Sequence, residues 1–385
     1  MSRNFRSSQP TLRALGNQYH ERLRSIKVGN PLEGAMWYPW ASLGAIDTLD
    51  GFLGGDADKL LKLMGSSPVL DVGCGDGDVA FFLESLGASR VDCIDHAPTN
   101  YNGMAGVRKM KQLLNSQVGI HAVDLDQRPN LPGSDYGLAL LLGVLYHLKN
   151  PFLVLETLAR NSRHLFLSTR IASLAPGGTL DFGAFPLAYL VDDDELNRDN
   201  TNFWIFSEPA LKRLLRRAGW DIRCYATAGA QASRSDPVTP EGDTRAYILA
   251  ETRLARPARS FRLDRGWHEL EYESWRWTAR RFSAVVNLTD RLAPATLLFR
   301  FHLPKPVLER RSALALSATV NGTALPTAVF STEGEHEYSA AVPSLEPGKV
   351  MVEFELDESI RAGDGDDREL GVLVSFVGES AITLS

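Results

Sequence analysis

The sequence predicts an α/β protein: a Rossmann-like, seven-stranded and mostly parallel sheet with helices on both faces, followed by a C-terminal antiparallel β-sandwich. Three observations predict this fold class. Strand and helix patterns alternate between residues 67 and 251, as they do in parallel sheets. A glycine-rich turn joins the first of these strands to a helix. Beyond residue 260, apolar residues recur at every second position, which is typical of strands with one buried face.

The composition is that of an ordinary globular protein. The chain has 385 residues, of which 44% are hydrophobic and 23% charged. A chain of this length predicts two or three domains. We expect an N-terminal helical and aromatic cap at 1–66, a cofactor domain at 67–251 that carries a lid insertion at 171–206, and the accessory sandwich at 260–385.

Several classes of protein are disfavoured. The longest apolar run is far shorter than the roughly 20 residues of a membrane span, and the N-terminus lacks the apolar core of a secretory signal. We therefore expect a cytoplasmic protein without a membrane span. Three widely spaced cysteines argue against a disulfide framework or a zinc site, and we expect no metal. The net charge of −6 disfavours a broad nucleic-acid footprint.

The cap contains an aromatic segment, Met36–Trp40, with three large rings in five residues. Two interpretations stay open: the rings anchor the cap onto the cofactor domain, or they form a wall beside the bound ligands. The first strand of the cofactor domain is expected at Pro68–Val72, and a helix is expected from Asp78.

The turn between them reads D-x-G-x-G-x-G, with Asp71 ahead of glycines 73, 75 and 77. Glycine at alternate positions lets the backbone turn tightly and approach a ligand closely. The pattern differs from the dinucleotide motif G-x-G-x-x-G, and no G-K-[ST] sequence for a nucleoside triphosphate follows.

The second strand, Arg90–Asp95, ends in an acid about 20 residues after the glycine turn. Ligands of open α/β sheets lie at the carboxyl ends of the strands, so Asp95 is well placed to accept hydrogen bonds from two ribose hydroxyls. The alternative is that Asp95 caps a helix that starts near Thr99. A helix at Tyr101–Leu114 and a third strand at Val118–Val123 follow.

The fourth strand, Tyr136–Leu142, is almost wholly apolar, as a central parallel strand should be. Tyr146 and His147 follow it, before a helix at Pro151–Arg160. They are our candidate catalytic residues, because a neutral imidazole at this edge can act as a general base toward a hydroxyl. The alternative is that His147 only packs or hydrogen-bonds within the loop.

The rest of the cofactor domain is expected to complete the sheet. Its elements are a strand at Arg163–Thr169, a helix at Glu208–Ala218, and strands at Trp220–Thr227 and Thr244–Glu251. The outer face of the helix is basic (Lys212, Arg213, Arg216 and Arg217). A solvated face is favoured over an RNA-binding stripe.

In the C-terminal region, Asn321-Gly322 predicts a hairpin turn. No helical pattern of comparable length appears there, which favours a sandwich. Trp267, Trp275 and Trp277 are expected in its core rather than as stacking platforms for sugar rings.

The D-x-G-x-G-x-G turn resembles motif I of the class I S-adenosylmethionine (SAM) methyltransferases. The resemblance implies that the turn wraps the methionine part of SAM and that S-adenosylhomocysteine is the product. It also implies that Asp124 holds the adenine amino group beside the Leu125 backbone, although Asp126 is an equally good acceptor. The expected cofactor-binding residues are Asp71, Gly73, Cys74, Gly75, Gly77, Asp95, His96, Asp124, Leu125 and Gly143.

Residues 67–225 further resemble the branch that contains the tRNA wobble-uridine methyl- and carboxymethyltransferases. The shared features are Gly143–His147, Ile94-Asp95 with Pro98-Thr99 close behind, and Asn202–Ser207. The enzymes that use carboxy-SAM place an arginine before that asparagine, where this chain has Thr201. Losing a charge-assisted partner for a carboxylate costs about 1.5–3 kcal/mol, so we expect SAM rather than carboxy-SAM.

Three C-terminal segments resemble accessory sandwiches of bacterial glycan-assembly enzymes: residues 266–271, 275–278 and 367–372. We therefore expect methyl transfer to a hydroxyl of a sugar, a glycan precursor or another small metabolite. The absence of an N-P-P-[YF] motif disfavours methylation of amino groups of DNA bases or glutamine. The alternatives are a tRNA wobble-uridine enzyme, with nucleic acid as partner, and a degenerate scaffold or binding protein. Homo-oligomers through the sandwich are a further expectation.

Overall fold

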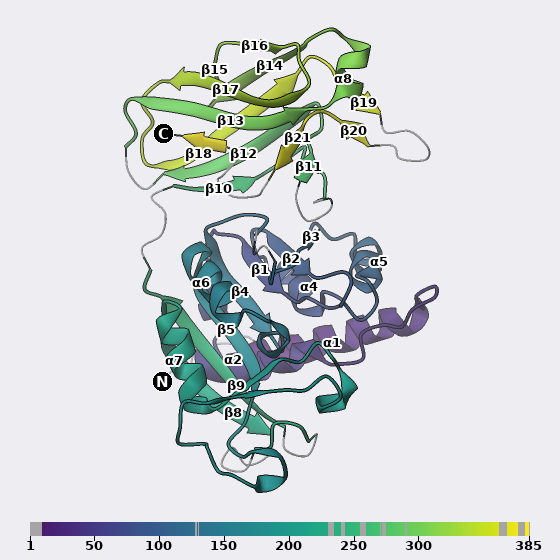
Figure 1. Cartoon of the computed structure of the whole chain (residues 1–385), viewed down its shortest axis with the longest axis vertical. Coiled ribbons are helices and arrows are strands. Elements are labelled where there is room, and N and C mark those ends of the chain that lie inside the picture. Colours follow the sequence, from purple (N-terminus) through teal and green to yellow (C-terminus); the bar gives the residue numbers. More distant parts are fainter. Residues whose placement is uncertain are drawn as a thin grey trace, which may run out of the picture. The chain divides into compact units, whose positions relative to one another are not determined.

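The computed structural model describes residues 10–127, 129, 131–229, 235–239, 243–254, 259–269, 271, 275–288, 291–361, 368–375 and 382–384. The N-terminal residues 1–9, which lack the pattern of a signal, lie outside the described residues. The chain divides into two compact units (Figure 1). The first comprises Met1–Ile120 and Tyr136–Leu254, and the second comprises His121–Asp135 and Ala255–Ser385.

The main sheet contains the seven strands that the sequence predicts. They are β1 (Val69–Val72), β2 (Val91–Asp95), β3 (Gly119–Ala122), β4 (Tyr136–Leu142), β5 (Ser162–Ile171), β8 (Trp220–Gly229) and β9 (Thr244–Thr252). The order is β3-β2-β1-β4-β5, with β9 next to β5 and β8 next to β9. β1 is parallel to β2 and β4, and β4 is parallel to β5, whereas β9 is antiparallel to both neighbours. The Rossmann-like, mostly parallel sheet is thus confirmed.

Two short strands from the insertion extend this sheet to nine. β6 (Ala188–Leu190) pairs antiparallel with β7 (Trp204–Phe206), and β7 joins the end of β5 through Ile171 and Phe206. The sequence analysis missed both strands, because each has only three residues and forms by pairing with a distant partner rather than by a local pattern.

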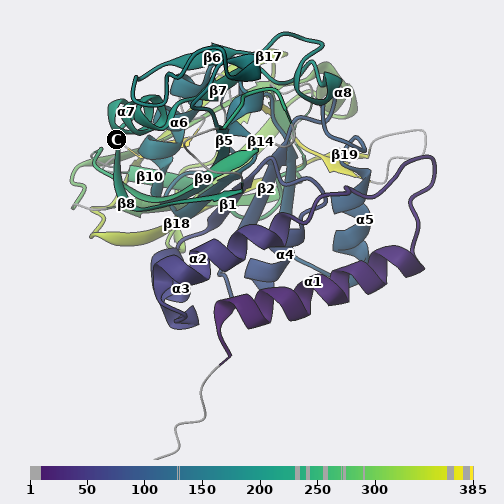
Figure 2. The ribbon, with the colours of Figure 1, turned by 90° about the horizontal axis from the view of Figure 1, so that it is seen from below.

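The helices of the first unit follow local signals. They are α1 (Leu12–Gly29), α2 (Ala45–Leu53), α3 (Ala57–Met64), α4 (Asp78–Ser85), α5 (Ala105–Leu114), α6 (Pro151–Asn161) and α7 (Glu208–Arg217), with 3₁₀ turns η1 (Ser42–Gly44), η2 (Leu145–His147), η3 (Pro176–Gly178) and η4 (Leu196–Arg198). Side chains of Thr11, Asp56, Asn150 and Ser207 cap α1, α3, α6 and α7. Figure 2 shows α1 lying along α2 and α4.

One helix starts later than expected. The pattern predicted a helix from Tyr101, but α5 begins at Ala105. Asn100 Oδ1 accepts hydrogen bonds from the backbone N–H groups of Asn102 and Met104, and thereby holds this stretch as a turn. Asparagine side chains compete with helical hydrogen bonds in this way.

The second unit contains two antiparallel sheets, which confirms the expected sandwich. One is formed by β10 (Arg259–Leu263), β12 (Arg281–Leu288), β14 (Leu314–Val320), β15 (Thr323–Ala324), β16 (Ala328–Phe330) and β18 (Gly348–Leu356). The other is formed by β11 (Trp275–Trp277), β13 (Ala295–Leu303), β17 (Gly334–Val342), β21 (Leu373–Ser375) and β22 (Ile382–Leu384). A short helix, α8 (Lys305–Arg310), and a two-stranded pair, β19 (Ile360–Arg361) with β20 (Glu369–Leu370), complete the unit.

The predicted hairpin turn joins β14 to β15. Asn321 and Gly322 have φ angles of 48° and 78°, the left-handed conformation that a type I′ hairpin turn requires at both positions.

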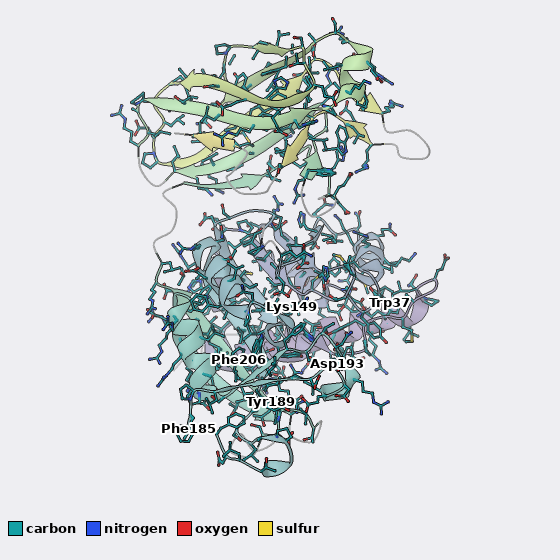
Figure 3. All side chains as sticks on the ribbon, in the orientation of Figure 1. Trp37, Lys149, Phe185, Tyr189, Asp193 and Phe206 are labelled. Carbon is teal, nitrogen blue, oxygen red and sulfur yellow. The ribbon has the colours of Figure 1, made fainter. Side chains whose placement is uncertain are left out.

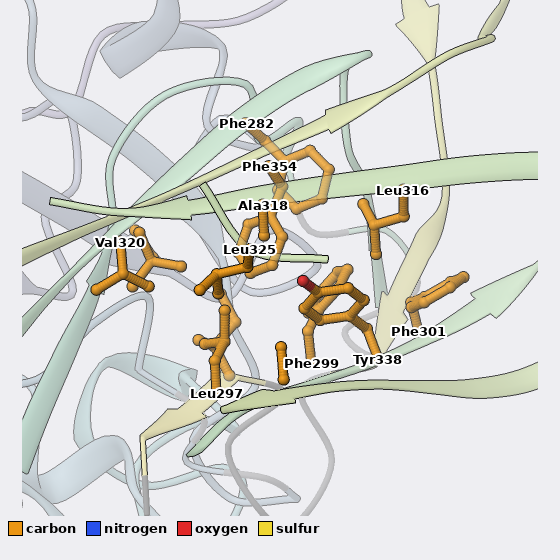
Figure 4. Packing of buried hydrophobic residues seen from close by; sticks show 14 of the residues in the cluster. Phe282, Leu297, Phe299, Phe301, Leu316, Ala318, Val320, Leu325, Tyr338 and Phe354 are labelled. Carbon is orange, nitrogen blue, oxygen red and sulfur yellow. The ribbon is translucent and has the colours of Figure 1, made fainter. Parts of the chain in front are cut away.

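Aromatic rings fill the centre of the sandwich (Figure 4). The ring of Phe299 lies 5.4 Å from that of Phe282, 5.2 Å from that of Phe301 and 4.6 Å from that of Phe354. Trp267 packs against Phe282, with its ring 5.1 Å away. Trp267 and Trp277 are partly buried, whereas Trp275 is 37% exposed, so only part of the expectation for the three tryptophans is met.

No helix among the described residues has both the length and the apolar composition that crossing a bilayer requires.

The aromatic core gives the first prediction. Phe299→Ala should destabilise the second unit by about 3–5 kcal/mol, because it removes a fully buried ring and leaves a cavity between the sheets. Urea unfolding of the whole chain measures this change. Val329→Ala is the control, since Val329 is 65% exposed and should change the free energy by less than about 0.5 kcal/mol. Equal effects of the two substitutions would contradict the packing described here.

Candidate functional site

The glycine turn lies between β1 and α4, at the carboxyl end of β1. Its three glycines have φ angles of 68°, 57° and 81°. A Cβ atom on Gly73 would lie 2.2 Å from Val144 Cγ2, and one on Gly77 would lie 2.8 Å from both Phe81 and Val107. Only glycine satisfies both the backbone conformation and the packing. The backbone N–H groups of all three glycines donate hydrogen bonds to other groups of the chain, which fixes the path of the turn.

Asp95, at the end of β2, holds this turn in place. Its carboxylate accepts hydrogen bonds from Gly75 N–H (2.9 Å), His96 N–H (2.8 Å) and Asn100 Nδ2 (2.9 Å). A carboxylate has about four acceptor positions, so these donors leave one for a ribose hydroxyl. The alternative role as a helix cap is not seen, since α5 begins at Ala105 after Met104.

Two further predicted cofactor residues flank Asp95. Cys74 is buried in the turn, and its hydrogen bond with the Cys93 thiol, together with burial, raises its pKa. His96 directs Nδ1 toward the Thr99 hydroxyl at 3.0 Å. The ring of His96 therefore shapes the loop after β2, and its predicted contact with a cofactor stays a prediction.

Asp71 lies beneath the turn and is fully buried. Burial, together with the charge of Asp95, raises the pKa of Asp71 to about 7. Its carboxylate accepts a hydrogen bond from Ala80 N–H, and among the described residues Oδ2 has no hydrogen-bond partner. A buried carboxylate oxygen without a partner is costly unless a donor binds it.

The aromatic segment of the cap covers the turn. The ring of Tyr38 lies 3.4 Å from the position of a Cβ on Gly75. It also lies 4.9 Å from the ring of Trp40 and 6.0 Å from that of Tyr101. Trp37 instead packs back on α1, where its Nε1 donates to Asn30 O. Tyr38 thus anchors the segment onto the cofactor domain, as the first interpretation expects, and a wall beside bound ligands stays a prediction.

His147 lies in η2, directly after β4. Its Nδ1 contacts the Thr201 hydroxyl at 2.9 Å and the Thr201 carbonyl at 3.1 Å. The hydroxyl itself donates to Asp199 Oδ1 at 2.6 Å, and a carbonyl only accepts, so Nδ1 carries the hydrogen. Burial lowers the pKa of His147. The ring is therefore neutral near pH 7 and presents the lone pair of Nε2 as a base.

Tyr146 lies beside His147, with the ring centroids 4.4 Å apart. Its hydroxyl lies 3.5 Å from Arg245 Nη2, and the Arg245 guanidinium lies over its ring. Gly143, with a φ of 75°, turns the chain next to the Tyr146 hydroxyl and the Arg245 guanidinium. The structure thus brings Gly143, Tyr146 and His147 together, as the sequence predicts.

Arg245 was missed by the sequence analysis. It is the second residue of β9, which runs antiparallel to β5 and pairs Thr244 with Ile171. The first residues of β9 therefore lie where the parallel strands end. An arginine at the start of a final antiparallel strand is the signal that could have identified it.

Asp124 and Leu125 belong to the segment His121–Asp135, which groups with the second unit. Asp124 Oδ1 accepts hydrogen bonds from the backbone N–H groups of Asp126 and Gln127. Asp124 thus shapes this turn, and the adenine role of Asp124 and Leu125 stays a prediction.

The insertion packs over Tyr146. Phe182, Val191, Leu196 and Ile205 form a small buried cluster against which Tyr146 packs. Phe203 N–H also donates to the Tyr146 carbonyl at 2.7 Å. Figure 3 labels Phe185, Tyr189, Asp193 and Phe206 of this insertion.

The basic face of α7 is largely solvated. Lys212 pairs with Glu208 at 2.5 Å and lies over the ring of Tyr225. Arg213, Arg216 and Arg217 are exposed.

Comparisons with known proteins concern mainly the first unit. The family model described as a methyltransferase domain matches residues 50–225. The chain is similar to tRNA U34 carboxymethyltransferases of Shewanella. The one from Shewanella sp. (strain W3-18-1) is 29% identical over 175 residues, which are 44% of this chain and 49% of the relative. The chain thus spans about half the length of these curated relatives.

Solved structures are similar to part of this chain. The N-terminal domain of EvdMO1 with S-adenosylhomocysteine bound has a TM-score of 0.41 and 15% identity, and the match covers 60% of this chain and 95% of that one. An S-adenosylmethionine-dependent methyltransferase from Mesorhizobium loti has a TM-score of 0.36 and 16% identity, and that match covers 50% of this chain and 94% of the other.

Asp71 gives a prediction for pH dependence. Its pKa of about 7 in the folded chain exceeds the value of 3.8 for an unperturbed carboxyl. The stability that its proton confers is therefore fully present below about pH 4 and is lost as the pH rises through about 7. Asp71→Asn should remove this loss, on the order of a few kcal/mol. Urea unfolding of the ligand-free protein across this pH range measures it.

Asp47→Asn is the matched control, because Asp47 is a half-exposed partner of Arg13. This variant should follow the wild-type pH profile. A profile for Asp71→Asn that coincides with that of the wild type would show that Asp71 is not the group that titrates.

Proposed function

We propose that this chain, whose residues 50–225 match a methyltransferase domain, is a class I SAM-dependent methyltransferase that methylates a hydroxyl group of a sugar, a glycan precursor or another small metabolite. The observation that carries this proposal is the neutral, oriented imidazole of His147 at the carboxyl end of β4. A hydroxyl is a poor nucleophile until a base accepts its proton, and a neutral imidazole is suited to that task near pH 7.

The residues at the glycine turn fit SAM. The glycines have positive φ angles, and a Cβ on Gly73 or Gly77 would clash with packed side chains, so the backbone of the turn carries no side chain of its own at these positions. Asp71 offers a buried oxygen without a partner, and Asp95 offers an acceptor position for a ribose hydroxyl. In the proposed arrangement Gly73, Cys74, Gly75 and Gly77 surround the methionine part, as motif I implies.

Bound SAM supplies an activated methyl group on a sulfonium. The residues of this chain then have two tasks. Tyr146, Gly143 and the insertion align the acceptor oxygen with that methyl carbon, since displacement needs an in-line approach. His147 Nε2 accepts the hydroxyl proton as the C–O bond forms, and Thr201 fixes the ring through Nδ1.

The preference for SAM over carboxy-SAM remains part of the proposal. Thr201 stands where the carboxy-SAM enzymes place an arginine, and its hydroxyl is occupied by His147 and Asp199. This arrangement supports a role for Thr201 in orienting the base rather than in binding a carboxylate.

A second candidate is modification of the tRNA wobble uridine, the activity for which the similar Shewanella proteins are named. The exposed arginines of α7 offer phosphate contacts in this case. Binding of unmodified tRNA should then weaken linearly on a log–log plot against salt, with a slope of about −0.7 to −0.9 for each phosphate contacted. Fluorescence anisotropy with the wild type and with Arg213→Gln/Arg217→Gln tests this candidate.

The third prediction concerns the proposed base. His147→Gln should lower kcat by about 10²–10⁴-fold, because no side chain then accepts the proton, while SAM affinity stays close to that of the wild type. The measurement is formation of S-adenosylhomocysteine with a panel of hexoses, 6-deoxyhexoses and nucleotide sugars, together with calorimetry for SAM. His336→Gln, a histidine of the sandwich that contacts Thr332 O, is the control.

Unchanged turnover in His147→Gln would remove the base from the mechanism. Turnover of tRNA but of none of the sugars would replace the first candidate by the second.

A further inference from the structure

Asp76, a non-glycine residue of the turn, connects three parts of the chain. It is only 2% exposed. Its Oδ2 accepts hydrogen bonds from Tyr38 N–H at 2.8 Å and pairs with Lys27 Nζ at 3.0 Å. Its Oδ1 accepts a hydrogen bond from Asn102 Nδ2 at 2.8 Å. The aromatic segment, the last turn of α1 and the residues just before α5 thus all contact the Asp76 carboxylate.

The packing between Asp76 and the start of α5 is tight. A Cβ on Gly106 would lie 1.9 Å from Asp76 Oδ1. Gly106 N–H donates to Asn102 Oδ1, which turns the Asn102 amide toward Asp76. The start of α5 is therefore built around the Asp76 side chain.

Lys27 supplies the positive charge. It lies in the last turn of α1, and its side chain is 13% exposed. Its ammonium pairs with Asp76 and, at 2.9 Å, with Asp78. It also lies 5.6 Å from the centre of the Trp37 ring (labelled in Figure 3). Without Lys27, two nearly buried carboxylates would face each other.

These contacts fix the aromatic segment over the turn. The backbone of Tyr38 is held by Asp76, and its ring lies over Gly75. Residues 31–41 contain no helix or strand, so the position of Tyr38 depends on such contacts rather than on regular secondary structure.

We infer that Asp76, Lys27 and Tyr38 form a latch that closes the cap over the cofactor and sets the affinity for SAM. Asp76 and Lys27 act as positioning residues, and Tyr38 is the side chain that covers the ligand. This inference rests on the proposed placement of SAM at the glycine turn. If only the closed form binds tightly, the apparent dissociation constant equals the intrinsic one divided by the closed fraction. Weakening the latch then weakens SAM binding even when the fold is intact.

The fourth prediction compares two substitutions of Lys27. Lys27→Met removes the charge but keeps most of the side-chain volume, whereas Lys27→Arg keeps the charge. Lys27→Met should weaken binding of S-adenosylhomocysteine and SAM by about tenfold or more, as expected for loss of a charged hydrogen bond. Lys27→Arg should retain affinity within about threefold of the wild type, because its guanidinium still pairs with both carboxylates. Calorimetry far below the unfolding temperature measures the affinities.

A second readout distinguishes the latch from a purely structural ion pair. Amide hydrogen exchange of the peptide that contains Tyr38 should be faster in ligand-free Lys27→Met and in Asp76→Asn than in the wild type. Added S-adenosylhomocysteine should restore its protection. Arg223→Gln is the control, since Arg223 forms an exposed pair with Glu251 on β8 and β9, and it should change neither affinity nor exchange.

The outcomes are separable. Lower thermal stability of Lys27→Met with wild-type affinity would overturn the latch and leave a structural ion pair. Equal losses in Lys27→Met and Lys27→Arg would likewise contradict a charge-dependent closure. Asp95→Ala tests the assumed placement of the cofactor at the glycine turn independently of the latch. If the wild type binds S-adenosylhomocysteine and this variant binds it equally well, that placement is wrong.

Discussion

The hydrogen bond from Gly75 N–H to the Asp95 carboxylate is the interaction on which the site depends. It exists because β1 and β2 run parallel and in register, with Val72 opposite Ile94, so the residues that follow both strands leave the sheet at one edge. Once Asp95 holds Gly75, the turn has a fixed path into α4. The backbone of the turn, the buried Asp71 and the ring of Tyr38 over Gly75 are then placed relative to it.

The same edge of the sheet explains why the candidate acceptor residues lie close to one another. β4 is parallel to β1, and Gly143, Tyr146 and His147 follow its last residue, Leu142. β9 is antiparallel and begins there, which brings in Arg245. The insertion adds a buried cluster on Tyr146 and the Thr201 contact with His147. The sheet thus places His147 at this edge, and Thr201 of the insertion fixes the orientation of its ring.

Much of this arrangement could be predicted from the sequence because it depends on local chemistry. The bounds of β4 followed from an uninterrupted apolar run, and the hairpin at Asn321 and Gly322 followed from the backbone conformation that these residues adopt readily. Asp95 and His147 were found from their positions after strands. The remainder depends on distant parts of the chain. Lys27 and Asp76 are 49 positions apart in the numbering, and nothing local marks either as the other's partner. β6 and β7 exist only through pairing, and Asn100 delays α5 by hydrogen bonds that compete with a helical pattern.

The measurement that tests the central claim most directly is calorimetry of the whole chain with SAM, S-adenosylhomocysteine and carboxy-SAM, repeated with Asp95→Ala. We predict that the wild type binds SAM and S-adenosylhomocysteine, binds carboxy-SAM more weakly, and loses affinity for all three in the variant. Preference for carboxy-SAM would contradict the role assigned to Thr201 and would favour the tRNA candidate. Undiminished binding by Asp95→Ala would contradict the cofactor site itself.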